Sequence, residues 1–424
     1  MPGAPPVSRQ PDSSTPPRRH RGLHLHRDRP KPGPAPLMTQ HILIIGAGII
    51  GTALADRLAP HTRVTIIDSH QPGQGTTATS LAWLNANKTL DPDYFAFRQD
   101  ALAEWARLAA ELGHPSWYVP AGNMTWAQTD TTRTELAQRV ERLRARGYAA
   151  RLITPSEARA IEPALTIPAG ALIAHFPEEG FIHGTQAIQA LMDRAHNAGA
   201  QLITQDPVAN LLRHGDRVTG VRLESGADIA ADVTVCAAGW RTPEILATAD
   251  LTIPLLDVHA PGSAAPCLVA ATTPASGVLR GLIHAPGVYA RPAWDGGLLL
   301  EASDLDAKID MNTPMPTLQS QAEEFLDRAR SIIPALTQAH IAQARRCIRP
   351  MPLDGLPLIG WHLPRLYVAA THSGITSPHT LPNSPPVGSR PVATSTSSLP
   401  TGPTGPYIAP SQVRRWKLHE TLST

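Results

Sequence analysis

The sequence predicts an α/β protein of two domains, in which a parallel sheet is interleaved along the chain with an antiparallel sheet. Three observations predict this fold class. A buried strand, a glycine turn and a helix follow one another near residue 45, and a second group of α/β elements begins near residue 185. Between residues 255 and 302, short apolar runs are separated by tight turns, which is typical of antiparallel strands.

The stretch from His41 to Asp68 predicts a dinucleotide-binding unit. Ile42 to Ile45 is a continuous apolar run, short enough for a strand buried on both faces. The turn GAGIIG follows at residues 46–51, then a helical pattern, and then a second apolar run that ends on Asp68. Strand, glycine turn, helix, strand and acid in this order are typical of a Rossmann-like unit. A glycine-rich turn in another kind of α/β protein is the alternative.

Each glycine of this turn has a physical role. Gly46 allows the tight turn, Gly48 lets backbone N–H groups approach a pyrophosphate, and Gly51 lets the helix pack closely on the strand. The helix N-terminus faces the phosphates with its positive end, and the Asp68 carboxylate can accept hydrogen bonds from a ribose diol. We therefore expect the following residues to bind the cofactor: Gly46, Gly48, Ile49, Ile50, Gly51, Asp68 and Ser69.

Composition excludes several other classes. The net charge of the 424-residue chain is +2, and the basic excess lies in the N-terminal tail, which argues against a nucleic-acid surface on the folded part. Cys236, Cys267 and Cys347 are too far apart for a disulfide framework or a metal knuckle, so we expect a reducing, cytoplasmic location. No apolar run reaches the length of about 18 residues that a transmembrane segment needs.

Prolines concentrate at the two ends of the chain. Ten lie between Pro2 and Pro36 and nine between Pro378 and Pro410, so we expect disordered tails at residues 1–37 and 377–424. Met38 would be a natural start directly before the first strand. The folded body is therefore expected to span about residues 38–376.

Periodicity predicts the elements of that body. Helices are expected at residues 94–112, 132–146, 185–198 and 323–333, and the capping box TPSE at 154–157 begins a short one. Strands are expected around a turn within 117–126, and at 201–208, 218–224, 231–237 and 366–370. Two loops have small or hydroxyl side chains that allow close approach to a cofactor, and they contribute Gly75, Thr76, Thr77, Ala238 and Gly239.

A second motif lies near the end of the body. Residues 349–360 read RPMPLDGLPLIG, and the AAGW turn stands at 237–240. With the glycine turn, these pieces resemble the D-amino-acid oxidase-like superfamily of flavoproteins, which includes glycine oxidase, sarcosine oxidase and D-amino-acid dehydrogenase. The resemblance runs from about His41 to Thr376. It implies FAD as the cofactor, with Val208 on the adenine side. Through this resemblance, the glycine turn after the last strand adds Ser373, Gly374 and Ile375 as expected cofactor contacts.

The resemblance also implies a division into domains. Residues 38–90, 154–250 and 346–376 would form the FAD-binding domain, and residues 91–153 and 251–345 an antiparallel substrate domain.

The function implied is oxidation of an amino acid or secondary amine at its C–N bond, by hydride transfer to flavin N5. Oxygen or a carrier would then take the electrons, and no metal is expected. Arg349 falls where such proteins bind the substrate carboxylate, with a structural ion pair as the alternative, and Arg291 is a second candidate. His372 would lie near the flavin as a catalytic or a structural histidine.

Cys347 lies seven residues before Asp354, the spacing at which sarcosine-oxidase-like members carry a covalent flavin. The alternative is a buried free thiol.

The end of the chain departs from the family pattern. Relatives continue the turn after Ser373 with a long helix whose N-terminus faces the flavin, whereas this chain continues with a Pro/Ser/Thr-rich tract. A change of reading frame in a GC-rich gene would produce such a boundary. Two alternatives to the flavin oxidoreductase therefore stay open: an NAD(P)-dependent dehydrogenase, and a non-catalytic remnant that lacks the flavin-facing helix.

Overall fold

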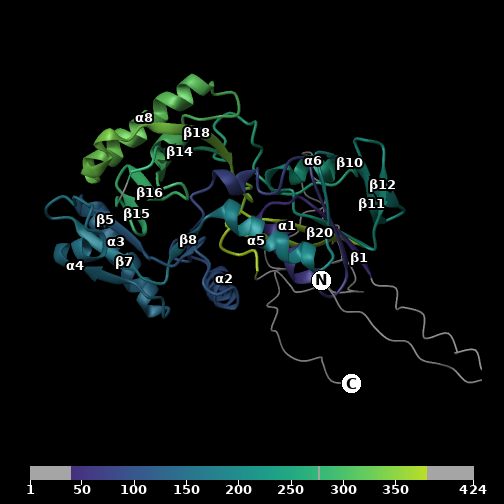
Figure 1. Cartoon of the computed structure of the whole chain (residues 1–424), viewed down its shortest axis with the longest axis horizontal. Helices are drawn as coiled ribbons and strands as arrows, with labels where there is room; N and C mark the ends of the chain where they lie inside the picture. Colours follow the sequence, from purple (N-terminus) through teal and green to yellow (C-terminus); the bar gives the residue numbers. More distant parts are fainter. Residues whose placement is uncertain (1–39, 276, 380–424) are drawn as a thin grey trace, which may run out of the picture. The chain divides into compact units, whose positions relative to one another are not determined.

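The computed structural model describes residues 40–275 and 277–379 of the protein (Figure 1). The tail expected at 1–37 lies outside the described residues, and so does the tail expected at 377–424 from residue 380 onward. The described chain forms a mixed α/β fold with four sheets, which confirms the predicted fold class.

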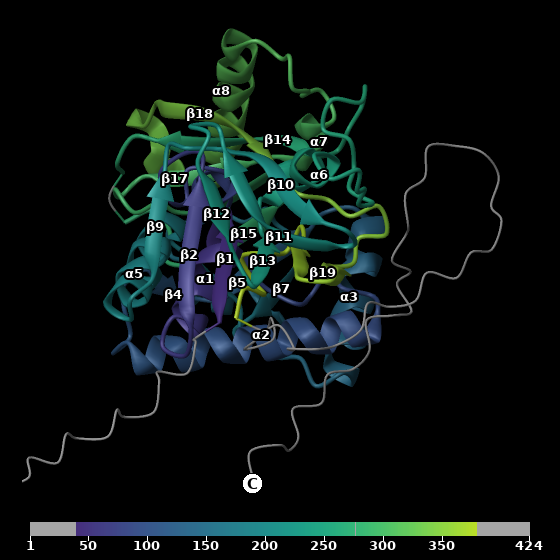
Figure 2. The same ribbon diagram turned by 90° about the vertical axis from the view of Figure 1, so that its right-hand side faces the viewer.

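A six-stranded sheet contains the glycine turn. Its strand order is β19-β20-β13-β1-β2-β9, and every neighbouring pair is parallel except β19 with β20. Figure 2 shows β2, β1 and β13 side by side. The strands are β1 (His41–Ile45), β2 (Arg63–Asp68), β9 (Gln201–Thr204), β13 (Val233–Cys236), β19 (Leu358–Leu363) and β20 (Leu366–Ala370).

Both faces of this sheet are covered, as the apolar runs predict. Ile42 and Ile44 point into one core with helices α1 (Ile49–Leu58) and α5 (Gly184–Asn197). Leu43 and Ile45 point into a second core on the other face. That core includes α6 (Thr242–Ala247) and a three-stranded sheet of β10 (Val208–His214), β11 (Arg217–Leu223) and β12 (Asp228–Ala230).

The larger sheet has eight strands, in the order β18-β14-β17-β16-β15-β5-β7-β6. Strand β15 pairs with β5 in parallel, so the expectation of a wholly antiparallel sheet is wrong at this pair. A parallel pair is possible here because β5 and β15 are not joined by a short hairpin turn, which would require an antiparallel pair. The strands are β5 (Asn123–Ala127), β6 (Arg151–Ile153), β7 (Leu172–Phe176), β14 (Pro266–Thr272), β15 (Leu282–Ala285), β16 (Val288–Pro292), β17 (Leu298–Glu301) and β18 (Ile341–Ile348).

Helices pack against this sheet. Helix α8 (Met315–Ile332) contacts β14, β17 and β18, and it begins eight residues earlier than periodicity predicts (Figure 1). Helix α3 (Asp130–Ala145) packs on β5, β6 and β7. Helix α2 (Pro92–Glu111) is capped by Asp91, and α4 (Pro155–Ile161) begins at the predicted capping box of Thr154. The four-residue helix α7 (Ser303–Asp306) follows β17 directly.

The strands expected around a turn within 117–126 are present as β4 (Tyr118–Val119) and β5, and they lie in different sheets, because β4 joins β3 (Trp83–Leu84) and β8 (Gly180–Ile182) in a small sheet of its own. One other strand prediction is wrong in its bounds. The strand expected at 201–208 ends at Thr204, and Val208 begins β10 in a different sheet.

The domain division stays a proposal. The six-stranded sheet takes strands from all three ranges expected for the FAD-binding domain. Strand β7 also lies within 154–250, but it pairs with β5 and β6 in the eight-stranded sheet.

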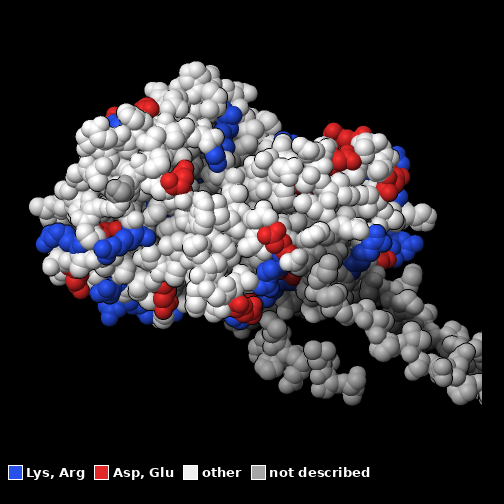
Figure 3. Space-filling model, in the orientation of Figure 1, with Lys and Arg blue, Asp and Glu red and all other residues white. Residues whose placement is uncertain are grey.

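The described surface carries charges of both signs. Figure 3 shows acidic and basic side chains interspersed on the visible face. Over residues 40–275 and 277–379, every helix is too short or too polar to cross a bilayer.

Candidate active site

A long cavity of about 1190 Å³ opens where the parallel strands end. The carboxyl ends of β1, β2 and β13 contribute Ile45, Asp68 and Ala237 to its wall, which is where open α/β sheets bind their ligands. Every residue expected to touch the cofactor lines this cavity except Gly51.

The glycine turn has the geometry that its sequence predicts. Gly46 adopts a φ of +102°, and a Cβ there would lie 2.5 Å from the carbonyl oxygen of Ala237. A Cβ on Gly51 would lie 1.9 Å from the carbonyl oxygen of Gly46, so Gly51 fits α1 against the turn and does not contact the cavity. Gly48 is the N-cap of α1 and supplies no side chain to bond the first helical turn. Apart from that of Ile49, which bonds Thr77, the N–H groups at this helix end are therefore left to a ligand.

Asp68 is fixed at the edge of the cavity by two backbone donors. Its Oδ2 accepts a hydrogen bond from the N–H of Ala47 at 2.7 Å, and its Oδ1 accepts one from the N–H of His70 at 2.8 Å. An ionised carboxylate has about four acceptor positions. Asp68 therefore keeps acceptor capacity for a ribose diol.

The hydroxyl-rich loop closes over the helix end as a short 3₁₀ helix, Thr76–Thr79. Thr77 Oγ1 accepts a hydrogen bond from the N–H of Ile49 at 3.2 Å. Thr76 Oγ1 donates to the carbonyl oxygen of Ile348 at 2.6 Å, which ties this loop to the end of β18. The loop thereby connects the two large sheets through the cavity wall.

The two ends of the cavity differ in chemistry. One end is lined by Val208, Ala238 and Gly239, together with Glu224 and Thr248. The other end gathers ionisable and aromatic side chains from widely separated segments, and these are Trp83, Lys88, Arg98, His284, Tyr289, Glu301, Arg349 and His372.

Arg349 lines this second end and also forms the ion pair that the sequence left open. Its Nη1 lies 3.3 Å from Oδ2 of Asp306 and 3.9 Å from Oε1 of Glu301. Its Nη2 donates to the carbonyl oxygen of Ala264 at 2.6 Å. The guanidinium is thus held at the cavity wall by groups that neutralise part of its charge.

His372 lies on the turn after β20 and faces the cavity. Burial, together with the positive charge of Arg349, lowers its pKa to about 4, so the ring is neutral at pH 7.

Arg291, the second candidate for the carboxylate, does not line the cavity. Its buried guanidinium donates to the carbonyl oxygens of Leu81 and Pro292. These bonds hold the guanidinium on backbone carbonyl groups, outside the residues that line the cavity.

Cys347 lines the cavity and faces Cys267 directly across β14 and β18. Both thiols are buried and free. The hydrogen bond from Cys267 lowers the pKa of Cys347. A covalent flavin at Cys347 stays a prediction, with the buried free thiol as its alternative.

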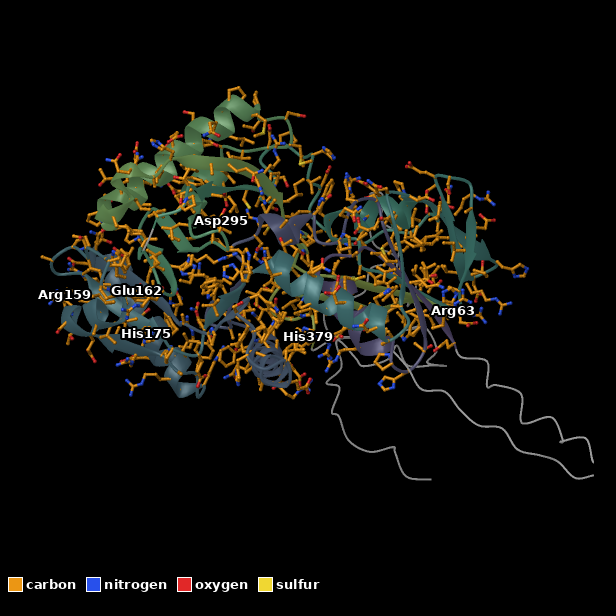
Figure 4. All side chains as sticks on the ribbon, viewed as in Figure 1. Arg63, Arg159, Glu162, His175, Asp295 and His379 are labelled. Carbon is orange, nitrogen blue, oxygen red and sulfur yellow. The ribbon has the colours of Figure 1, made fainter. Side chains whose placement is uncertain are left out.

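The last described residues pack against α2. Trp105 Nε1 donates to the carbonyl oxygen of Ile375 at 2.9 Å. The ring of His379, which is labelled in Figure 4, lies edge-on to the ring of Trp105, with 4.7 Å between the ring centroids. The N–H groups of Thr376 and Ser377 both bond the carbonyl oxygen of Ser373, which forms one turn of helical character. The flavin-facing helix expected in relatives would continue from this turn, and its position falls largely outside the described residues.

Sequence reasoning missed Lys88, His284, Tyr289 and Glu301. Lys88 Nζ lies 5.3 Å from the ring centroids of both Trp83 and Tyr289. Burial lowers the pKa of His284 well below its usual value, so its ring is neutral as well. One signal was available: Glu301 ends the apolar run 298–300 with a carboxylate, just as Asp68 ends its own strand.

A parallel sheet that opens at a glycine turn onto a long cavity is the arrangement of a dinucleotide-binding oxidoreductase. The family model of FAD-dependent oxidoreductases named DAO matches residues 41–378, and the chain belongs to this family.

Two curated relatives illustrate the similarity. Glycine oxidase of Geobacillus kaustophilus is 27% identical over 343 residues, covering 78% of this chain and 87% of that protein. Sarcosine oxidase subunit beta of an Arthrobacter species is 24% identical, covering 84% of this chain and 91% of its own length.

Solved structures share the fold. The crystal structure of glycine oxidase from Geobacillus kaustophilus superposes with a TM-score of 0.68 at 24% identity, covering 80% of this chain and 92% of that one. L-proline dehydrogenase from P. horikoshii gives a TM-score of 0.68 at 22% identity, covering 81% and 91%.

The protein is therefore an FAD-dependent oxidoreductase of the amino-acid and amine class, and the NAD(P)-dependent alternative is not favoured. The residues present fit FAD. Gly48 lines the cavity without a side chain that would intrude on a ligand, and as the N-cap of α1 it adds no side-chain cap to the helix end. The volume exceeds the range of about 300–1,000 Å³ that is usual for small-ligand pockets.

Proposed function

We propose that this protein binds FAD along the cavity and oxidises a small amino acid or secondary amine at its C–N bond. One observation carries the proposal. A single cavity joins the glycine turn and Asp68 to a wall that carries Arg349, Lys88 and Glu301. When bound, the flavin supplies the electron chemistry by accepting hydride at N5. The protein positions the substrate and excludes water.

The proposed cofactor contacts follow from the walls of the cavity. The N-terminus of α1 and the 3₁₀ helix at Thr76 face the diphosphate, and Asp68 accepts from the ribose. The residues around Val208 and Gly239 hold the adenine side. The turn at Ser373 and Gly374, with the neutral ring of His372, lies at the flavin end. Arg349 at that end binds the substrate carboxylate.

We expect FAD, and not NAD, to copurify with the protein. The test is the absorption spectrum of the purified protein, before and after anaerobic addition of a panel of amines and amino acids. Flavin bands that bleach with at least one of these compounds are expected. Folded protein without flavin absorbance that NAD stabilises against heat would contradict the proposal. Bound flavin that no amine in the panel reduces would favour the non-catalytic remnant.

Replacing Arg349 with lysine is expected to raise the KM for carboxylated amines by roughly 5- to 150-fold, while flavin content changes little. Lysine keeps the charge but loses the fork that binds a carboxylate through two parallel hydrogen bonds, a loss of about 1–3 kcal/mol. Steady-state kinetics and the flavin-to-protein ratio give both values. An amine substrate without a carboxylate is the control, and its KM should change less. Equal kinetics for wild type and variant on carboxylated amines would remove Arg349 from the binding site.

We also propose the cytoplasm as the location, which the three free, buried thiols of the described chain support. Comparing dioxygen with an artificial dye as the oxidant in the same assay identifies the electron acceptor.

A further inference from the structure

Glu301 is the last residue of β17, and its carboxylate faces the cavity. The side chain is 16% exposed. Within residues 40–275 and 277–379, no donor lies within hydrogen-bonding distance of its carboxylate. Holding a largely buried carboxylate without a hydrogen-bond donor costs free energy. Glu301 therefore has acceptor capacity that a ligand in the cavity can use.

The groups around Glu301 come from four other segments. Arg349 Nη1, after β18, lies 3.9 Å from Oε1 of Glu301. The thiol of Cys267 on β14 and a carboxylate oxygen of Asp306 on α7 lie within 4.8 Å of the Glu301 carboxylate and of each other. Lys88, which follows β3, and Cys347 on β18 also interact with Glu301 electrostatically. The acidic groups of this cluster therefore already have a cation beside them, the guanidinium of Arg349.

The groups around Glu301 shift its pKa in opposite directions. Burial and the negative charge of Asp306 raise the pKa of Glu301 to about 7, although Arg349 and Lys88 act in the opposite direction. A carboxyl group with this pKa can both accept and release a proton near neutral pH, which is the property required of a general base.

The proposed function creates a need for such a group. A free amine in water near pH 7 is mostly an ammonium ion, because alkylamines titrate near the pKa of a lysine side chain, about 10. An ammonium nitrogen has no lone pair to support hydride loss from the adjacent carbon. The proton must therefore leave before the C–H bond breaks.

We propose that Glu301 is a catalytic residue that receives the ammonium proton of the substrate. The N–H bond breaks, its electron pair stays on nitrogen, and the proton bonds to the Glu301 carboxylate, giving a neutral amine and a carboxylic acid. Arg349, next to Glu301, is placed to hold the α-carboxylate of the same molecule. The adjacent guanidinium and carboxylate thus match the opposite charges of an α-amino acid, whose charged groups are separated by one carbon. This inference rests on the proposed oxidation of amines.

The test is the pH dependence of kcat/KM for the Glu301→Gln variant. In the wild type, kcat/KM is expected to rise with pH through about 7. In the variant, kcat/KM at pH 7 should fall by roughly 10²- to 10⁴-fold. The rise should move to the pKa of the free amine, so that the difference between the two proteins shrinks at high pH. A loss that is equal at every pH would overturn the proposal, because a structural role does not move the profile.

Two further variants sharpen the result. Glu301→Asp keeps a base and should retain the rise near neutral pH at reduced rate. Asp306 does not line the cavity, and its charge raises the pKa of Glu301, so Asp306→Asn should move the rise to lower pH without removing it. An unmoved rise in Asp306→Asn would count against Glu301 as the titrating group.

A readout that does not depend on turnover is also available. Infrared difference spectra of the purified protein, recorded across pH 5–9, should show carboxylic-acid absorption that is lost near pH 7 in wild type, and Glu301→Gln should lack the part due to Glu301 while keeping the part due to Glu179. The failures of the two proposals can be told apart. Wild-type protein that oxidises no amine contradicts the proposed function, whereas an active wild type with an unchanged profile in Glu301→Gln contradicts only the role of Glu301.

Discussion

Replacement of Gly51 by alanine is expected to destabilise the fold and to abolish FAD retention. The new Cβ would lie 1.9 Å from the carbonyl oxygen of Gly46, and this oxygen is a backbone atom that cannot rotate away as a side chain could. Either α1 must move away from β1 or the turn at Gly46 must change its conformation. Overpacking of a buried site costs about 1–3 kcal/mol, and a clash with backbone falls at the upper end of that range. Either movement would also distort the N-terminus of α1, which we propose faces the diphosphate of FAD.

The matched control is Gly360→Ala. Gly360 lies on β19, and nothing would lie within 4 Å of a Cβ there. Thermal unfolding and the flavin-to-protein ratio are measured for both variants. We expect a lower melting temperature and colourless protein for Gly51→Ala, and values close to wild type for Gly360→Ala. Wild-type stability and flavin content in Gly51→Ala would contradict the close packing of α1 on the turn.

A large effect of pH on stability is expected from the buried carboxylate of Glu179. Glu179 is 0% exposed and accepts hydrogen bonds from Trp83 Nε1 at 2.9 Å, Asn123 Nδ2 at 3.0 Å and the Tyr148 hydroxyl at 2.7 Å. Burial raises its pKa to about 7 despite these donors. The folded state therefore binds this proton more tightly than the unfolded chain, in which the carboxyl titrates near 4.5.

The sign of the pH dependence follows from this difference. The stabilisation that Glu179 contributes is fully present below pH 4.5, and it is lost as the pH rises to about 7. At about 1.4 kcal/mol for each pKa unit, the loss is about 3 kcal/mol. Glu179→Gln does not titrate and should lack this decline, although it loses acceptor capacity at every pH.

Urea unfolding between pH 4.5 and 8 measures the decline. The difference in unfolding free energy between wild type and Glu179→Gln should be largest at the acidic end and should shrink toward pH 8. Glu135→Gln makes the same change on the exposed surface of α3 and should keep the wild-type pH dependence. If the unfolding free energies of wild type and Glu179→Gln change with pH in the same way, Glu179 has the same pKa in the folded and the unfolded state, which contradicts the prediction.

The sequence by itself determined the dinucleotide end of the site. Strand β1, the turn at 46–51, helix α1 and Asp68 were all predictable, because they are contiguous and their spacing is set by local geometry. Gly46 and Gly51 have the roles that their positions predict, and the capping box at Thr154 begins its helix. Resemblance to a known family added FAD and the class of reaction, through the motif at 349–360.

Only the tertiary structure shows which residues form the substrate end of the cavity. Lys88, His284, Glu301 and Arg349 lie up to 261 residues apart, and the tertiary fold brings them to one wall. No local pattern shows that β5 pairs in parallel with β15, or that Arg349 meets Asp306. The physical reason is that local spacing determines turns and helices, whereas register between distant strands depends on how the whole core packs.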